Sequence, residues 1–226
     1  MTNHHIKPLK SIRSAIVLAG LITAGLAGNY FKMPLYFGVD FLFGSIAVMV
    51  AVRLYGTVWG TITAAVAGGY TYFLWHHPYL IIIFTLEALV VGLLLRRKNE
   101  NIILYDGLYW IFIGMPLSWL IHYYLLKMGG TAVLLIVLKQ GVNGAFNALL
   151  AELIVTYLPV RRWAGGITAR EPVSMLRTVF NLLMAFVMLT GIMFIIKDSL
   201  WVKNELESDI RTEIFAESRR IVDDLT

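Results

Sequence analysis

The chain has 226 residues, of which 58% are hydrophobic and 15% are charged, with a mean hydropathy of +0.73 and a formal net charge of +5. A soluble domain is about half apolar and about a quarter charged, so this composition excludes an ordinary soluble domain and indicates an integral membrane protein with no nucleic-acid partner. There is no cysteine, which excludes a disulfide framework and a thiolate metal site.

The N-terminal residues 1–14 are basic and lead into an apolar stretch, a pattern that resembles a secretory signal peptide. No small-residue cleavage site follows in a suitable polar context, and further apolar segments come at once. We therefore interpret the first apolar segment as a retained membrane span.

Seven apolar segments have roughly the 17–25 residues that a helix needs to cross about 30 Å of hydrocarbon. They cover residues 12–31, 38–55, 57–75, 79–95, 105–126, 132–158 and 178–197. This pattern predicts an all-α fold, a polytopic membrane helical bundle with about seven transmembrane helices.

The loops between these segments differ in charge. If the N-terminus is cytoplasmic, the inner loops hold eleven basic residues, whereas the short outer loops hold only Lys32 and Lys127. The inner residues are Lys7, Lys10, Arg13, Arg53, Arg96, Arg97, Lys98, Arg161, Arg162, Arg170 and Arg177. The excess predicts a multi-pass membrane protein with its N-terminus in the cytoplasm and the residues after 197 outside.

The domain organisation follows from these segments. We predict a membrane-embedded bundle at residues 1–160, a cytoplasmic loop at 161–177 and a seventh helix at 178–197. Residues 198–226 are acidic, and their apolar positions follow helical spacing at Leu206, Ile210, Ile214, Ile221 and Leu225. They are either a solvated helical tail or the first helix of an extracytoplasmic domain. We favour the second interpretation, and expect a longer protein, because a regular apolar stripe needs a partner.

The sixth segment carries more polar residues than a lipid-facing helix tolerates. At 100° per residue, Lys139, Gln140, Asn143 and Asn147 fall on one stripe of the helix, whereas Glu152 falls on another side. An ammonium and amides that face hydrocarbon are costly, so the stripe should face the interior of the bundle or a wet cavity.

Other segments place polar groups at a comparable depth. Asp40 begins the second segment, Trp75 closes the third, Glu87 lies midway along the fourth, and Ser118 and His122 share a face of the fifth. We predict that these residues converge with the stripe on an outward-opening pocket for a small-molecule ligand. The predicted ligand-binding residues are Asp40, Trp75, Glu87, Ser118, His122, Lys139, Gln140, Asn143 and Asn147.

The same residues also allow a packing role. Lys139 could pair with Glu87 or Asp40 to hold helices together, and the asparagines could bridge helices by hydrogen bonds. The sequence leaves the pocket and the packing interpretations open.

The histidines allow a third interpretation. A haem held by two imidazoles is sterically conceivable, because the third and fifth segments both end at the outer side. Its candidate ligands are His76, His77 and His122. No spacing motif for a haem is present, and the cofactor is left unknown.

Rows of small residues on two segments indicate close helix packing. On the first segment they are Ala15, Ala19, Thr23 and Ala27, with Gly20, Ala24 and Gly28 on the adjoining row, and on the third they are Gly60, Ala64, Ala67, Gly68 and Gly69. Internal packing accounts for the third segment. For the first segment, self-association into a homodimer or docking of a partner helix stays open.

Residues 37–97, with the glycine-punctuated passage RLYGTVWG at 53–60, resemble the core of five-transmembrane Lyt-type sensor regions. They are more distantly similar to the substrate-binding S-components of energy-coupling-factor transporters. A longer resemblance, over residues 29–159, is to membrane sensor regions fused to PAS, diguanylate cyclase (GGDEF), phosphodiesterase or histidine kinase modules in bacteria. It implies an S-component-like core, a sensory input and the start of a Cache-like domain at 198–226, and it carries over no catalytic residue.

From this resemblance we expect a sensory module in the bacterial inner membrane, as part of a signal-transduction protein such as a two-component system or a diguanylate cyclase. Ligand binding would repack the fifth and sixth spans and shift the seventh. The alternatives are a solute-binding transport subunit and a haem-bearing redox sensor. The expected partners are the lipid bilayer, a small-molecule ligand and a second copy of the chain.

Overall fold

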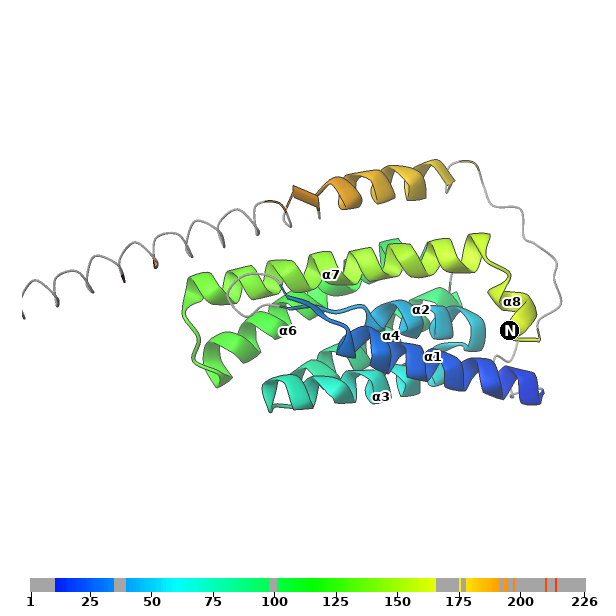
Figure 1. The fold of residues 1–226 in the computed structure, drawn as a ribbon, viewed down its shortest axis with the longest axis horizontal. Helices are drawn as coiled ribbons and strands as arrows, with labels where there is room; N and C mark the ends of the chain where they lie inside the picture. The colour runs from blue at the N-terminus through cyan, green and yellow to red at the C-terminus, as the bar shows by residue number, and fades with distance from the viewer. Residues whose placement is uncertain are drawn as a thin grey trace, which may run out of the picture.

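The computed structural model describes residues 11–34, 40–97, 101–165, 175, 178–191, 193–194, 197, 210 and 214. Its described residues form an elongated bundle in which the helices lie roughly along the long axis, some in one direction and some in the opposite direction (Figure 1). The predicted tail at 198–226, apart from Ile210 and Ile214, and most of the predicted loop at 161–177 lie outside the described residues.

The first half of the bundle consists of α1 (Ile12–Tyr30), β1 (Met33–Pro34), β2 (Asp40–Phe41), α2 (Gly44–Tyr55), α3 (Thr57–Trp75) and α4 (Tyr79–Arg97). The second half consists of α5 (Ile102–Tyr109), η2 (Trp110–Gly114), α6 (Met115–Leu120), η3 (Ile121–Leu125), α7 (Gly130–Tyr157) and α8 (Val160–Trp163). The two short strands pair antiparallel, with Met33 opposite Phe41. A further helix covers Thr178–Gly191.

Four helices of the described residues are long and apolar enough to cross a membrane. They are Ile12–Tyr30, Tyr79–Arg97, Ile102–Leu125 and Gly130–Tyr157. The prediction of an all-α bundle suited to a membrane is confirmed. The apolar helices Gly44–Tyr55 and Thr178–Gly191 are shorter, and the count of seven spans stays a prediction.

The two ends of the bundle differ in charge. The start of α1, the α2–α3 link, the end of α4 and α8 lie at one end, and the α3–α4 and η3–α7 links lie at the other (Figure 1). The first end holds Arg13, Arg53, Arg96, Arg97, Arg161 and Arg162. We refer to it as the arginine end. The asymmetry that the sequence shows between loops is therefore an asymmetry between the two ends of the folded bundle.

The second predicted span differs from the expected helix. The sequence predicts a span from residue 38, but Asp40–Phe43, which begins with strand β2 and is not helical, precedes α2, which begins at Gly44. We refer to these four residues, after their strand, as the extended stretch. With 12 residues, α2 is only about 18 Å long, which is too short to cross about 30 Å of hydrocarbon alone. Extended backbone at membrane depth is tolerated only where protein covers it and its polar groups are paired.

The polar stripe of α7 provides that pairing. The Leu42 N–H donates to Asn143 Oδ1 at 2.8 Å, and Asn143 Nδ2 donates to the Leu42 carbonyl at 2.7 Å. Asn147 Nδ2 donates to the same carbonyl at 2.8 Å, and Lys139 Nζ donates to the carbonyl of Asp40. The side chains at 139, 143 and 147 reach the extended stretch together because a spacing of four residues puts them on one helix face.

The first helix packs against the same region through small residues. Asn29 of α1 accepts from the Gly44 N–H at 3.0 Å and donates to the Ala67 carbonyl at 2.9 Å. A side chain at Gly28 would meet the Phe43 backbone, at 2.8 Å. Internal packing therefore accounts for part of the first small-residue row. Ala15, Ala19 and Thr23 are exposed, and a role for them in self-association stays a prediction.

The fifth span is one helix interrupted by two π-helical turns. The first, η2, lies directly before Pro116, where the Met115 N–H donates to the carbonyl of Trp110 instead of that of Ile111. Proline removes a backbone donor and disturbs the helical ladder, which accounts for the change of register. Gly144 of α7 leaves the space that the buried Trp110 indole occupies, because a side chain there would collide with the indole nitrogen.

The two asparagines of the stripe should differ in their effect on stability. Asn143→Leu leaves the Leu42 N–H without its partner and should lower the free energy of unfolding by about 1–3 kcal/mol. Asn147→Leu leaves the carbonyl with its bond from Asn143, so its cost should be about 0.6 kcal/mol. Unfolding of both purified variants in detergent checks this. Equal losses would contradict the role of Asn143 as the main cap of the extended stretch.

Candidate functional site

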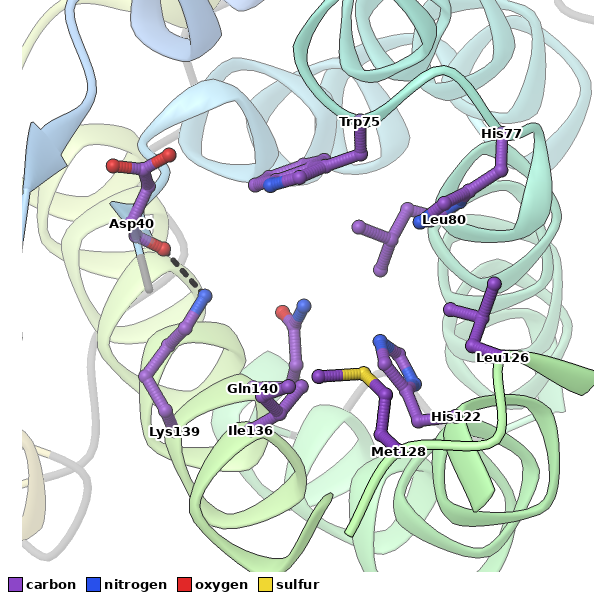
Figure 2. A pocket seen from close by; sticks show the side chains of 10 residues that line it. All are labelled: Asp40, Trp75, His77, Leu80, His122, Leu126, Met128, Ile136, Lys139 and Gln140. Atoms are coloured by element: carbon purple, nitrogen blue, oxygen red, sulfur yellow. Dashed lines mark hydrogen bonds between the residues drawn. The ribbon is translucent and has the colours of Figure 1, made fainter. Parts of the chain in front are cut away.

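A cavity with a volume of about 150 Å³ lies at the end of the bundle opposite the arginine end (Figure 2). Five parts of the chain supply its walls: the β2 strand, the end of α3 with the α3–α4 link and the start of α4, η3, the link to α7, and α7 itself. The lining residues are Asp40, Trp75, His77, Leu80, His122, Leu126, Met128, Ile136, Lys139 and Gln140. Polar and aromatic groups from distant parts of the sequence thus converge on one space.

The structure divides the predicted ligand-binding residues into two groups. Asp40, Trp75, His122, Lys139 and Gln140 line the cavity. Glu87, Ser118, Asn143 and Asn147 do not line it. Of the residues that the pocket prediction did not name, Leu80, Leu126, Met128 and Ile136 form apolar wall. The sequence has no signal that separates these apolar residues from their neighbours in the same segments.

Lys139 brings a positive charge to one wall. Its ammonium donates to the backbone carbonyl of Asp40, while the Asp40 carboxylate is bound at 2.6 Å by Lys32. Figure 2 shows the Asp40 carboxylate directed away from the Lys139 nitrogen. An ammonium has three N–H donors, so Lys139 has further donors for a group in the cavity.

His122 is oriented by its own helix. Ser118 supplies a carbonyl 2.7 Å from Nδ1 and a hydroxyl 3.3 Å from it. In the neutral ring this carbonyl fixes the proton on Nδ1, because a carbonyl oxygen only accepts, and Nε2 is then an acceptor. The role of Ser118 is to position His122, which agrees with their predicted i, i+4 spacing on one face.

His77 lies in the link between α3 and α4, on the wall of the cavity across from Lys139 (Figure 2). Burial lowers the pKa of His77 below its ordinary value, so the ring is neutral at pH 7. His76 is exposed and does not line the cavity. Ordinary ligand pockets have volumes of about 300–1,000 Å³, so a space of about 150 Å³ between His77 and His122 favours a small ligand over a haem. Within the described residues, no cluster of three or more His, Asp or Glu side chains could hold a metal ion.

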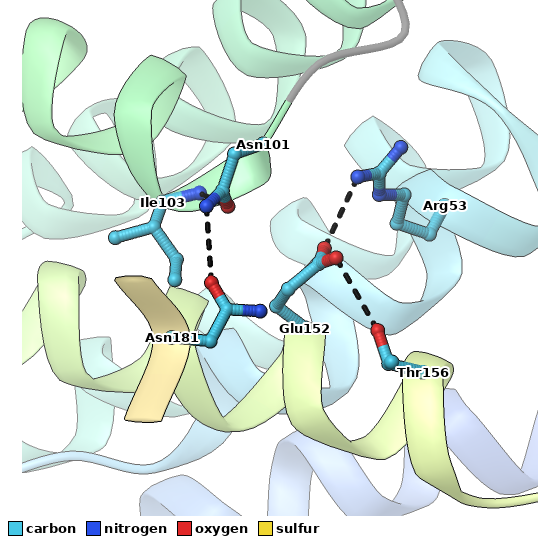
Figure 3. Close-up of polar contacts among 6 residues, drawn as sticks. All are labelled: Arg53, Asn101, Ile103, Glu152, Thr156 and Asn181. Carbon is cyan, nitrogen blue, oxygen red and sulfur yellow. Dashed lines mark hydrogen bonds and ion pairs between the residues drawn. The ribbon is translucent and has the colours of Figure 1, made fainter. Parts of the chain in front are cut away.

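Near the arginine end, polar side chains from different parts of the chain are bonded to one another (Figure 3). Glu152 of α7 is paired with Arg53 of α2 at 3.1 Å, and the two side chains are 0% and 5% exposed. Asn101, before α5, donates to Asn181 of the helix Thr178–Gly191 at 3.1 Å. Glu152 thus lies apart from the stripe of Lys139 and Asn143, as the angular argument predicts, and it ties α7 to α2.

The helix Thr178–Gly191 packs against the bundle with one face. Asn181 is 1% exposed, and Met184, Ala185 and Met188 contact the hydrophobic core. The spacing of these four positions is that of one side of a helix. A change in the packing of the bundle can therefore reach this helix directly.

No protein-family model matches this chain, and no curated protein matches it.

Removal of the carboxylate from the buried ion pair should be costly. Glu152→Gln takes away the charge that compensates Arg53 and should lower the free energy of unfolding by about 3–5 kcal/mol. The double variant Arg53→Met/Glu152→Leu should recover most of that loss, because two apolar side chains leave no uncompensated charge. Unfolding of Glu152→Gln and of the double variant in detergent measures this recovery. A double variant that loses as much stability as Glu152→Gln, or more, would exclude a coupled pair.

Proposed function

We propose that the chain is the membrane sensory module of a bacterial signal-transduction protein and that it binds a small anionic molecule in the cavity of Figure 2. The observation that carries the proposal is the convergence of Trp75, His122, Lys139 and Gln140 from separate segments on one space. An intramembrane ionisable residue that faces a cavity is by default a candidate for function.

The orientation of the bundle supports an input from outside the cell. The cavity lies opposite the arginine end, and basic residues are concentrated on the cytoplasmic side of membrane proteins. Seven spans, with the helix Thr178–Gly191 as part of the last, would then place the N-terminus inside and the residues after 197 outside. The sequence resemblance to Lyt-type sensor regions points to the same kind of module.

The volume and walls of the cavity limit the ligand. A cavity of about 150 Å³ accepts a molecule about the size of benzene. The ammonium of Lys139 favours a carboxylate or another small anion, Trp75 offers an apolar face, and Nε2 of His122 accepts a hydrogen bond. A small carboxylic acid or an amino acid fits these groups.

The signal would pass through the packing of α7. Lys139 and Gln140 line the cavity on the same helix whose asparagines hold the extended stretch at Leu42. A ligand that draws Lys139 towards it shifts α7 against η3, and the helix Thr178–Gly191 packs on the same core. Ligand binding would select one of two packings of these helices.

A solute-binding transport subunit is the second candidate. The cavity serves such a subunit equally well, and the exposed row Ala15, Ala19 and Thr23 on α1 offers a surface on which a partner helix could pack closely. Co-purification of a membrane-embedded transporter partner would favour this candidate over the sensor.

Ligand binding is expected to depend on the charge at Lys139. A series of monocarboxylates from acetate to benzoate should raise the melting temperature of the purified protein, and Lys139→Met should abolish that rise. Lys127→Asn is the matched control, because it removes a positive charge at the same end from an exposed residue that does not line the cavity. An equal rise in Lys139→Met and wild type would exclude the anion site.

The orientation can be tested independently of the ligand. An alkaline phosphatase reporter, which is active only outside the cytoplasm, should be inactive after Lys98 or Arg170 and active after Lys203. An inactive fusion after Lys203 would exclude the seven-span topology. Activity after Lys98 would exclude the cytoplasmic position of the arginine end.

A further inference from the structure

A second group of polar residues lies inside the bundle, away from the lining of the cavity. Glu87 of α4 and Asp106 of α5 are each 0% exposed, and their carboxyl groups lie next to each other. The Ser45 hydroxyl of α2 donates to one Glu87 oxygen at 3.1 Å, and the Trp110 indole N–H of η2 donates to the other at 2.9 Å. Both oxygens of Glu87 thus accept, and three parts of the bundle meet on this side chain.

Asp106 is buried without such donors. No N–H or O–H donor of the described residues bonds to either of its oxygens, and its carboxyl lies against that of Glu87. An ionised carboxyl without a donor is very costly in an apolar interior, and a second negative charge beside it adds repulsion. The two side chains therefore cannot both be carboxylates in this arrangement.

No cation compensates the pair within the part of the chain that the structure describes. The ion pairs there join Lys32 to Asp40 and Arg53 to Glu152. Tyr109, which lies near both carboxyl groups, brings no positive charge, and its hydroxyl donates to the Ile83 carbonyl at 2.6 Å.

The elements that pack around the pair bring no other charge to it. From α2 the facing group is the Ser45 hydroxyl, and α3 contains no acidic or basic residue. The buried acid of α7, Glu152, is held by Arg53. The charge of the site is therefore set by the protons on Glu87 and Asp106 alone.

We propose that Glu87 and Asp106 form an intramembrane proton-binding site, in which one proton is held between the two carboxyl groups and joins α4 to α5. Glu87 is the carboxylate, because Ser45 and Trp110 already donate to it, and Asp106 is the neutral acid that donates to Glu87. Release of the proton to water leaves two adjacent anions, which repel each other and weaken the contact between α4 and α5. This site is independent of the ligand cavity and of the proposed sensory function.

Infrared spectroscopy of the purified protein at neutral pH tests the protonation state. Relative to the double variant Glu87→Gln/Asp106→Asn, the wild type should show one C=O band of a protonated carboxylic acid and one band of a carboxylate. The matched control is Arg53→Met/Glu152→Leu, because it removes an equally buried carboxyl without leaving Arg53 uncompensated, and it should leave the acid band intact. Two carboxylate bands, or two acid bands, in the difference spectrum would overturn the proposal.

A measurement on the wild type covers the case in which the double variant does not fold. A hydrophobic carbodiimide reacts with protonated carboxyl groups inside membranes. The acid proton moves to a carbodiimide nitrogen, and the carboxylate oxygen adds to the central carbon of the reagent. Transfer of the acyl group to the neighbouring nitrogen then gives a stable N-acylurea. Mass spectrometry should locate this adduct on Glu87 or Asp106 and not on Glu152. Modification of Glu152 with the pair unmodified would overturn the proposal.

The dependence of stability on pH gives a third readout. The folded chain holds a proton that ordinary carboxyl groups of the unfolded chain release at about pH 4, so stability should fall as the pH rises above that value. For one proton, the unfolding equilibrium constant should rise by about tenfold per pH unit relative to the double variant, from about pH 5 up to the pH at which the folded pair releases its proton. Equal pH dependence in wild type and double variant would exclude a bound proton.

Discussion

The extended stretch Asp40–Phe43 is the constraint on which much of the bundle depends. Backbone N–H and C=O groups at membrane depth must be paired inside the protein, and a strand without a full sheet cannot pair its own. Asn143 and Asn147 of α7 perform this task at Leu42, and Lys139 does so at Asp40. The short length of α2 and the tight approach of α7 both follow from this arrangement.

The polar stripe of α7 has two roles at two depths. Lys139 and Gln140, nearer the start of α7, line the cavity, whereas Asn143 and Asn147, further along, are bound to the backbone of Leu42. One stripe thus combines a cavity wall with contacts that pack the bundle, and ligand binding there stays a prediction. Because Lys139 contacts both the extended stretch and the cavity, a ligand there would act on the packing of the bundle.

The bundle buries its two fully covered glutamates in different ways. Glu152 is compensated by the guanidinium of Arg53, which keeps a charge pair between α7 and α2. Glu87 has only the neutral donors Ser45 and Trp110 and the second carboxyl of Asp106. The negative charge is balanced by a guanidinium in the first arrangement and, in the site that we propose, by a proton in the second.

The sequence by itself determined the membrane class, the helices from Tyr79 to Arg97 and from Gly130 to Tyr157 to within a few residues, and the polar face of α7. Apolar length and helical periodicity report these features directly. Only the tertiary structure decided that residues 40–43 begin with a strand and stay outside the helix, because an apolar run has the same composition in a buried strand and in a buried helix. It also decided that Met128 lines the cavity and that Asp106 meets Glu87. Periodicity shows which face of a helix avoids lipid, but the partner of that face is set by how distant segments pack.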